Sequence, residues 1–216
     1  MNLKKVRTYK KYSRYWEGFF SKNPVLISGL ALPFAVMVSV NLKSAVALSI
    51  TMAGTVIPTV LLASLIGQKL PKWICAIIYT VFSMVMVVTC AALILPMFPE
   101  IVDALGVYIP IVAVNTMLLW LCSKYSSDKP SPWMALVDAV MYSLGFAFAI
   151  CLISLLREYF GNNTIWGVAV NFPIKFSGLQ IAFAGFILVA FLNAGFRGLK
   201  RLILFAVYRH SNPKVT

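Results

Sequence analysis

The sequence predicts an all-α integral membrane protein with six transmembrane helices, arranged as two inverted repeats of three helices each. Its composition gives the class, because 61% of the 216 residues are hydrophobic and only 12% are charged. Soluble domains carry about 25% charged residues. Its apolar stretches give the helices, since each is about as long as a helix needs to cross a bilayer. The expected spans are residues 25–41, 44–66, 73–95, 107–122, 133–156 and 178–196.

The first expected span is interrupted. Residues 23–40 read NPVLISGLALPFAVMVSV, and Pro33 lies well inside this apolar run, with Gly29 just upstream. Proline lacks an N–H group and clashes with the carbonyl four residues back, so a helix kinks or ends there. In hydrocarbon the freed backbone groups must be covered by protein or must line a water-filled cavity. We expect a discontinuous helix that faces inward, with a plain kinked helix as the alternative.

The fourth expected span matches the first in character. It is short, reading VYIPIVAVNTMLLWLC, and carries Pro110 near its start. Because each half of the chain would have three spans, the second half would cross the membrane in the opposite sense to the first. Interrupted helices at matching positions of two halves indicate a site near mid-membrane between inverted repeats.

Positive charges predict the orientation of the chain and the nature of its two terminal segments. Residues 1–22 form a basic and aromatic lead, residues 23–196 the membrane domain, and residues 197–216 a basic tail. If residue 1 is cytoplasmic, sixteen of the nineteen Lys and Arg residues fall on the cytoplasmic side. The positive-inside rule then places both termini in the cytoplasm. The lead and the tail would lie at the lipid interface, and this placement explains the net charge of +13 without a nucleic-acid partner.

Several segments resemble the membrane subunits of the Rnf and Nqr electron-transport complexes, and are most similar to the RnfE/NqrD branch. They are the residue 23–40 segment with its entry WEGFFSKNPVL, then YIPIVAVNT, ALVDAVMYSLGF and LLREYFGNNTIWG. The resemblance covers roughly residues 16–196. It implies a bacterial-type inner (plasma) membrane protein with both termini inside, and a six-helix fold of two inverted repeats. It also implies a sister subunit of the RnfA/NqrE type, of opposite orientation, together with other Rnf/Nqr-like subunits.

The same resemblance implies an iron–sulfur cluster shared by the two sister subunits, each giving one cysteine from each interrupted helix. In this sequence those two ligand positions fall on Pro33 and Thr116, neither of which supplies the required thiolate. Cys122 lies six residues beyond Thr116, about 9 Å along a helix, which is too far to substitute. We therefore expect no cofactor or metal in this subunit, and the cysteines to be buried free thiols.

Four residues are candidates for a cavity or path near mid-membrane: Pro33, Asn115, Thr116 and Asp138. Asn115 and Thr116 would either line a small polar cavity or hydrogen-bond across helices. An acid within the membrane indicates an ion or proton path. The alternative for Asp138 is an interfacial carboxylate that caps a neighbouring helix end or hydrogen-bonds Ser or Asn. We expect Arg157 and Glu158 to be a pair that extends its charges to the outer interface.

Three functions of different class follow. The first is an RnfE/NqrD-like subunit of an ion-translocating electron-transport complex of the ferredoxin/NADH/quinone oxidoreductase type, without its own cluster ligands. The second is a stand-alone inverted-repeat transporter for a solute or ion, and the third is an assembly subunit that transports nothing. The sequence shows no phosphate-binding loop, no nucleophile with its base and no paired catalytic carboxylates. It thus predicts at most a non-catalytic subunit of a redox-driven translocase.

Overall fold

The structure is a computed structural model that describes residues 18–19, 22–67, 69–96, 99, 106, 108–127, 131–170 and 175–211. Most of the predicted lead at residues 1–22 lies outside these residues, as does most of the connector after the third span. Within the described part the chain is helical apart from one two-stranded hairpin. The elements are α2 (Leu32–Met37), α3 (Leu42–Ile66), α4 (Lys72–Ile94), α6 (Tyr108–Ile111), η2 (Val112–Val114), α7 (Thr116–Ser127), α8 (Pro132–Asn162), β1 (Thr164–Ile165), β2 (Val168–Ala169), η3 (Ser177–Gln180) and α9 (Ala182–Ser211).

Four of the described helices contain stretches long and apolar enough to cross a membrane. These stretches are Leu42–Ile66, Trp73–Ile94, Pro132–Asn162 and Ala182–Leu199. They correspond to the second, third, fifth and sixth expected spans, so the all-helical membrane class is confirmed. The first and fourth expected spans are built from short helices instead, and the count of six spans and the inverted repeats remain predictions.

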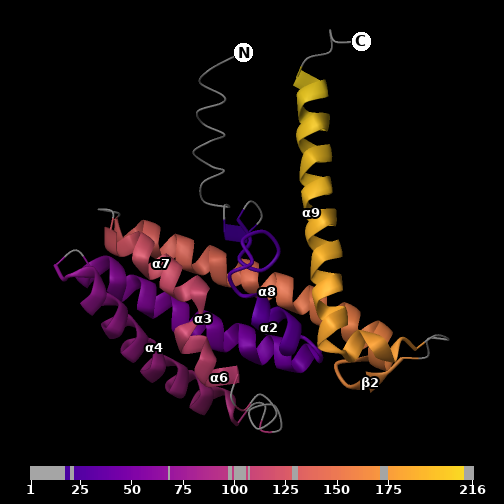
Figure 1. Cartoon of the computed structure of the whole chain (residues 1–216), viewed down its shortest axis with the longest axis horizontal. Helices are drawn as coiled ribbons and strands as arrows, with labels where there is room; N and C mark the ends of the chain where they lie inside the picture. The colour runs from indigo at the N-terminus through magenta and orange to yellow at the C-terminus, as the bar shows by residue number, and fades with distance from the viewer. Residues whose placement is uncertain are drawn as a thin grey trace.

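The core is formed where α3 packs along α8 (Figure 1). The two helices run in opposite directions, because the start of α3 meets the end of α8 through a hydrogen bond from the Leu42 N–H group to Glu158. Small residues on both helices let the backbones approach closely. Larger side chains between them are fully buried and fill the remaining space: Leu48, Met52, Phe146, Ile150 and Ile153.

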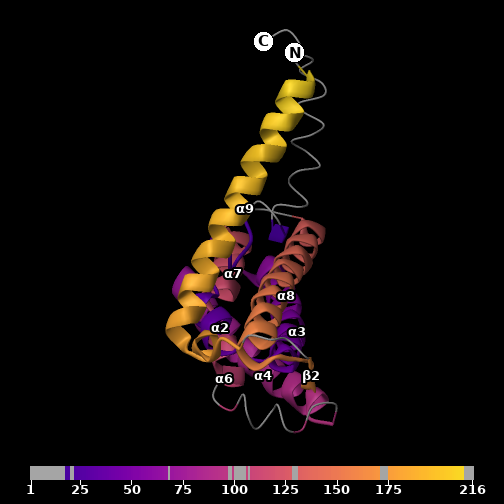
Figure 2. The same ribbon diagram turned by 90° about the vertical axis from the view of Figure 1, so that its right-hand side faces the viewer.

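The helix α9 differs from the expected sixth span in length. It begins at Ala182 and continues as helix to Ser211, so residues 197–211 extend the same helix beyond the expected span. Figures 1 and 2 show it leaving the helical body next to β2 and projecting well beyond it. Its contacts with the body are to α2, η3 and α8. Most of its apolar surface therefore has no protein cover within the described chain.

Candidate functional site

The first interruption lies upstream of Pro33. The side-chain Oδ1 of Asn23 accepts the N–H groups of Val25 and Leu26, both at 3.0 Å, and so begins a short stretch of turns. That stretch ends at Gly29, whose φ of +66° is open to glycine because it has no Cβ. Helix α2 then begins at Leu32, with Pro33 in its first turn, where a missing N–H group needs no partner. Pro33 therefore starts the second half of the helix, which corrects the expectation that the helix ends there.

The second interruption is at Asn115. Helix α6 and the turn η2 end at this residue, whose backbone is extended, with φ of −67° and ψ of 135°. Its Oδ1 accepts the N–H group of Met117 at 2.9 Å, so the side chain caps the start of α7. The asparagine thus both breaks the first helical segment and begins the second, and the fourth expected span is interrupted as the sequence predicts.

The two interruptions meet. The hydroxyl of Thr116 donates a hydrogen bond to the Leu30 carbonyl, which joins the two interrupted helices directly. Around the second interruption, the Asn115 side chain lies 3.7 Å from the sulfur of Met52, and Ser83 donates to the Ala113 carbonyl at 2.7 Å. Met52 lies about 15 Å along α3 from its start, and Ser83 lies about the same distance along α4, at a rise of 1.5 Å per residue. Both positions are near the middle of these long helices, so the two interruptions meet near the middle of the helical body.

The candidate residues at the interruptions differ in exposure. Asn115 is buried, with 3% of its surface exposed, and its amide is engaged in the cap. Pro33 and Thr116 both lie on the surface of the isolated chain. Around them are exposed apolar side chains: Met37 (48% exposed), Val114 (51%) and Trp120 (39%). The two positions that the resemblance assigns to cluster ligands therefore lie on the surface of the isolated chain.

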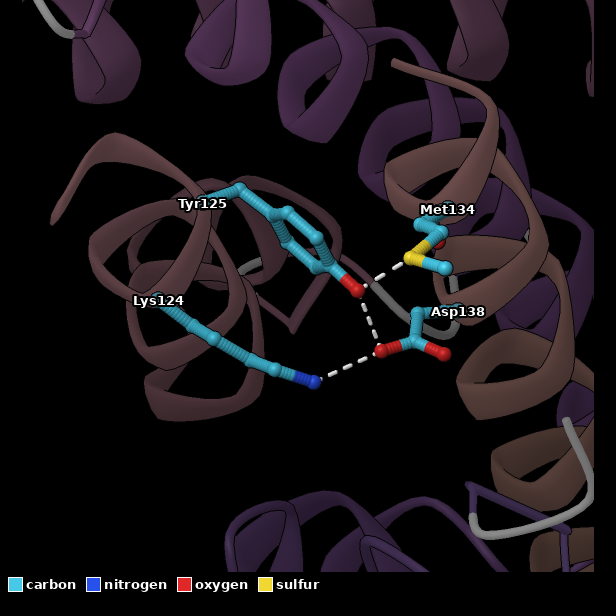
Figure 3. Close-up of polar contacts among 4 residues, drawn as sticks. All are labelled: Lys124, Tyr125, Met134 and Asp138. Carbon is cyan, nitrogen blue, oxygen red and sulfur yellow. Dashed lines mark hydrogen bonds and ion pairs between the residues drawn. The ribbon is translucent and has the colours of Figure 1, made fainter. Parts of the chain in front are cut away.

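Asp138 lies apart from the two interruptions. Its Oδ2 accepts hydrogen bonds from the Lys124 ammonium at 2.6 Å and from the Tyr125 hydroxyl, and Tyr125 also lies 3.3 Å from the Met134 carbonyl (Figure 3). Tyr125 is nine residues beyond Thr116, about 13 Å along α7. The structure thus joins Asp138 to the far end of α7 and does not bring it together with Asn115 and Thr116.

Lys124 has further partners in the same group. Its ammonium lies 5.6 Å from the ring centre of Trp120 and 5.0 Å from that of Tyr125. Such positions over an aromatic face favour a cation. The acid, the ammonium and the two rings tie the end of α7 to the start of α8. Asp138 is thus a local hydrogen-bond acceptor at the start of α8, and its partners are Lys124 and Tyr125 rather than the Ser or Asn of the expected alternative.

Arg157 and Glu158 differ from their expected placement. The expectation that their side chains extend outward to the interface is wrong, because Arg157 is 0% exposed and Glu158 3% exposed. Glu158 accepts the N–H groups of Leu42 at 2.6 Å and Gly167 at 2.9 Å, and the hydroxyl of Thr164 at 3.2 Å. It therefore holds the start of α3 against the hairpin that follows α8.

A signal for this burial was present in the sequence. Arg157 follows Ile153 by four residues and precedes Gly161 by four, so all three share one face of a helix. Ile153 and Gly161 are an apolar residue and a small one, which is typical of a packed face. In the structure both are buried beside Arg157.

No cysteine lies in either interruption, as residues 28–33 and 112–116 show directly. Cys122 is buried two turns along α7, Cys75 and Cys90 are on α4, and Cys151 is on α8. Iron–sulfur clusters are held by cysteine thiolates, whereas the two ligand positions carry the ring of Pro33 and the hydroxyl of Thr116. The residues at the interruptions therefore do not fit a cluster.

Comparison with known proteins gives one family and several relatives. A family described as "Rnf-Nqr subunit, membrane protein" matches residues 12–203. The E subunit of the ion-translocating oxidoreductase complex of Shewanella loihica is 27% identical over 154 residues, which cover 70% of this chain and 65% of that protein. The D subunit of the Na(+)-translocating NADH-quinone reductase of Tolumonas auensis is 22% identical over 163 residues, covering 76% and 75%. The chain thus spans about 65% of the length of the Shewanella relative.

Proposed function

Because the chain belongs to the Rnf-Nqr family of membrane subunits, we propose that it is an integral subunit of an ion-translocating electron-transport complex. The match over residues 12–203 supports membership of the family, and the similarity to the Shewanella and Tolumonas proteins supports membership of the RnfE/NqrD branch. The structure adds that two interrupted helices meet at mid-height through Thr116 and Leu30. The family match is the observation that carries the proposal, and the contact of the two interrupted helices supports a shared region between the two halves of the chain.

The chain crosses the membrane six times, with both termini in the cytoplasm. The charge asymmetry of the sequence supports this topology. The structure supports it further by grouping the helix ends. Ser126 donates to the Gly67 carbonyl at 3.1 Å, so the end of α7 lies beside the end of α3. At the opposite end, Glu158 binds both Leu42 and Gly167, which places the start of α3 beside the hairpin. These groups match the expected cytoplasmic and outer connections.

This subunit does not bind an iron–sulfur cluster by itself. Replacing two thiolates by Pro33 and Thr116 removes the negative charge that balances the irons. Any electron relay in the complex would then use ligands on other subunits, and this chain would supply structure around the relay. A sister subunit of the RnfA/NqrE type would cover the surface that carries Pro33 and Thr116. The exposed apolar side chains around these two residues support a partner or lipid at this surface.

The experiment is anaerobic purification of the tagged chain, alone and with its co-purifying subunits, followed by assays of iron and acid-labile sulfide. We expect no stoichiometric iron in the isolated chain. Electron paramagnetic resonance after reduction should show no cluster signal. A stoichiometric signal lost on mutation of Cys75, Cys90, Cys122 or Cys151 would show that other thiolates bind the cluster. Purification without redox subunits, together with solute uptake into vesicles, would favour the stand-alone transporter.

A further inference from the structure

We propose that Arg157 is a positioning residue for the interruption site, the contact between Leu30 and Thr116. It fixes α2, the second half of the first interrupted helix, between α8 and the start of α9. By fixing α2 it determines where Leu30 meets Thr116. This inference concerns the architecture of the site and does not depend on what the complex carries.

The guanidinium group of Arg157 has all five of its N–H groups satisfied. Nη1 donates to the Val36 carbonyl at 2.5 Å and to the Ser39 hydroxyl at 3.0 Å, which both belong to α2 and the turn after it. The remaining N–H groups bind three carbonyls in the segment that leads into α9: Leu179 at 2.9 Å, Gln180 at 3.0 Å and Ile181 at 3.4 Å. Arginine presents five donors in one plane, so a single buried side chain joins three separate elements.

The contact is reciprocal on the side of α9. The side-chain nitrogen of Gln180 donates to the Arg157 carbonyl at 3.1 Å. A Cβ added at Gly161 would lie 2.6 Å from the same nitrogen, so the Gln180 side chain would have to shift to make room for it. Gly185 also faces the guanidinium, and a Cβ there would lie 3.3 Å from Nη1 and 3.4 Å from the Val36 carbonyl. The first turns of α9 are therefore fitted around Arg157.

No carboxylate among the described residues pairs with Arg157, and the oxygens of the adjacent Glu158 accept hydrogen bonds from Leu42, Thr164 and Gly167. The charge is instead surrounded by carbonyl oxygens. Main-chain carbonyls are fixed in direction, so they hold the guanidinium in one orientation. This pattern is suited to fixing backbone segments relative to one another.

Helix α2 depends on such a contact. It has six residues, fewer than two turns, and irregular backbone lies on both sides of it. Isolated helices shorter than about 12 residues are marginal, so tertiary contacts must hold α2 in place. Val36 is only six residues beyond Leu30, the residue that receives the Thr116 hydrogen bond. Losing the Arg157 contacts should therefore displace the first interruption relative to the second, while α3, α4 and α7 keep their packing.

Crosslinking in native membranes tests this. In a variant of the full chain without its four cysteines, Leu30→Cys with Thr116→Cys reports the interruption site. Tyr79→Cys with Ser126→Cys reports the α4–α7 contact, where the Tyr79 hydroxyl lies 3.3 Å from Ser126. We expect Arg157→Lys to lower the crosslinking yield of the Leu30–Thr116 pair about ten-fold, because an ammonium cannot satisfy acceptors on both sides. The yield of the Tyr79–Ser126 pair should stay at the parental level.

Milder variants test the positioning role of Arg157 if the Arg157→Lys variant does not insert into the membrane. Gly185→Ala places a methyl group against Nη1, whereas a Cβ at Gly195 on the same helix meets nothing within 4 Å. Gly185→Ala should lower only the Leu30–Thr116 yield, and Gly195→Ala should change neither pair. Ser39→Ala removes one of five acceptors and should have a smaller effect on the same pair. Equal behaviour of Gly185→Ala and Gly195→Ala, or parallel loss of both pairs in Arg157→Lys, would overturn the proposal.

Discussion

At the scale of single residues, two asparagines define the interrupted helices. Asn23 caps the first stretch of turns, and its amide nitrogen also donates to the Gly145 carbonyl of α8 at 2.8 Å. Asn115 caps α7 in the same manner. An asparagine cap is worth about 1 kcal/mol in an ordinary helix. The Asn115 cap also sets where the second interrupted helix restarts, at Thr116. The Asn23 cap sets where the first segment begins, whereas α2 restarts at Leu32 without a side-chain cap.

Asp138 provides the residue-scale prediction, because its contacts are those of a structural carboxylate. The side chain of Lys124 is 34% exposed and that of Asp138 18% exposed. Solvent screens a pair this exposed, so a coupling of about 0.2–1 kcal/mol is expected. We expect Asp138→Asn to lower the melting temperature of the purified protein slightly and to leave ion translocation by the assembled complex at the parental level.

A double-mutant cycle with Lys124→Met measures that coupling directly, with Lys43→Met as the matched control. Lys43 should show no coupling to Asp138, because it lies near the start of α3, at the other end of the helical body. Loss of translocation in Asp138→Asn with unchanged thermal stability would mean that the carboxylate is part of an ion path.

At the scale of elements, the helix α8 is the frame to which both interrupted helices are attached. Arg157 near its end binds the carbonyl of Val36 in α2, and Asp138 near its start binds Lys124 of α7. Between these points, Gly145 receives the hydrogen bond from Asn23. The second half of each interrupted helix is therefore attached to a different end of α8, and these attachments set the distance between the two halves.

Gly145 gives the prediction at this scale. A Cβ at this position would lie 2.5 Å from the Gly18 carbonyl oxygen, so the segment before Asn23 approaches α8 through two glycines. Gly145→Ala should destabilise the protein by about 1–3 kcal/mol, the usual cost of adding a methyl group to a well-packed contact. The control is Gly195→Ala, where the added Cβ meets nothing within 4 Å. Equal thermal stability of the two variants would show that this contact is not close.

How much of these elements the sequence predicts depends on the range of the interactions. The apolar runs predict the bounds of α3 and α4 to within two residues and the start of α8 to within one, because helix length and hydropathy are local properties. The end of α8, at Asn162, lies six residues beyond the expected end at residue 156. The interruptions are predicted too, but the first is displaced from Pro33 to Gly29, since the positive φ of Gly29 is a backbone feature with no unique sequence signal. Ile153 and Gly161 indicate a packed helix face around Arg157, but its five acceptors, four carbonyls and the Ser39 hydroxyl, come from two distant segments. Only the folded chain brings these acceptors together.

At the scale of the whole molecule, the ends of the helices form two groups. One group holds the end of α3 beside the end of α7, and the other holds the start of α3 beside the hairpin after α8. The positive charges of the sequence divide in the same way. This grouping supports the proposed topology, in which the two halves of the chain would cross the membrane in opposite senses. The interrupted helices meet near the middle of the helical body.

Labelling of single cysteines in intact cells tests this account most directly. Cysteines are placed at Gly106 and Gly167, expected outside, and at Lys69 and Ser126, expected in the cytoplasm. We expect an impermeant maleimide to label positions 106 and 167 in intact cells, and positions 69 and 126 only after the membrane is opened. Labelling of position 69 or 126 from outside, or protection of 106 or 167 until the membrane is opened, would contradict the six-span topology and the inverted halves built on it.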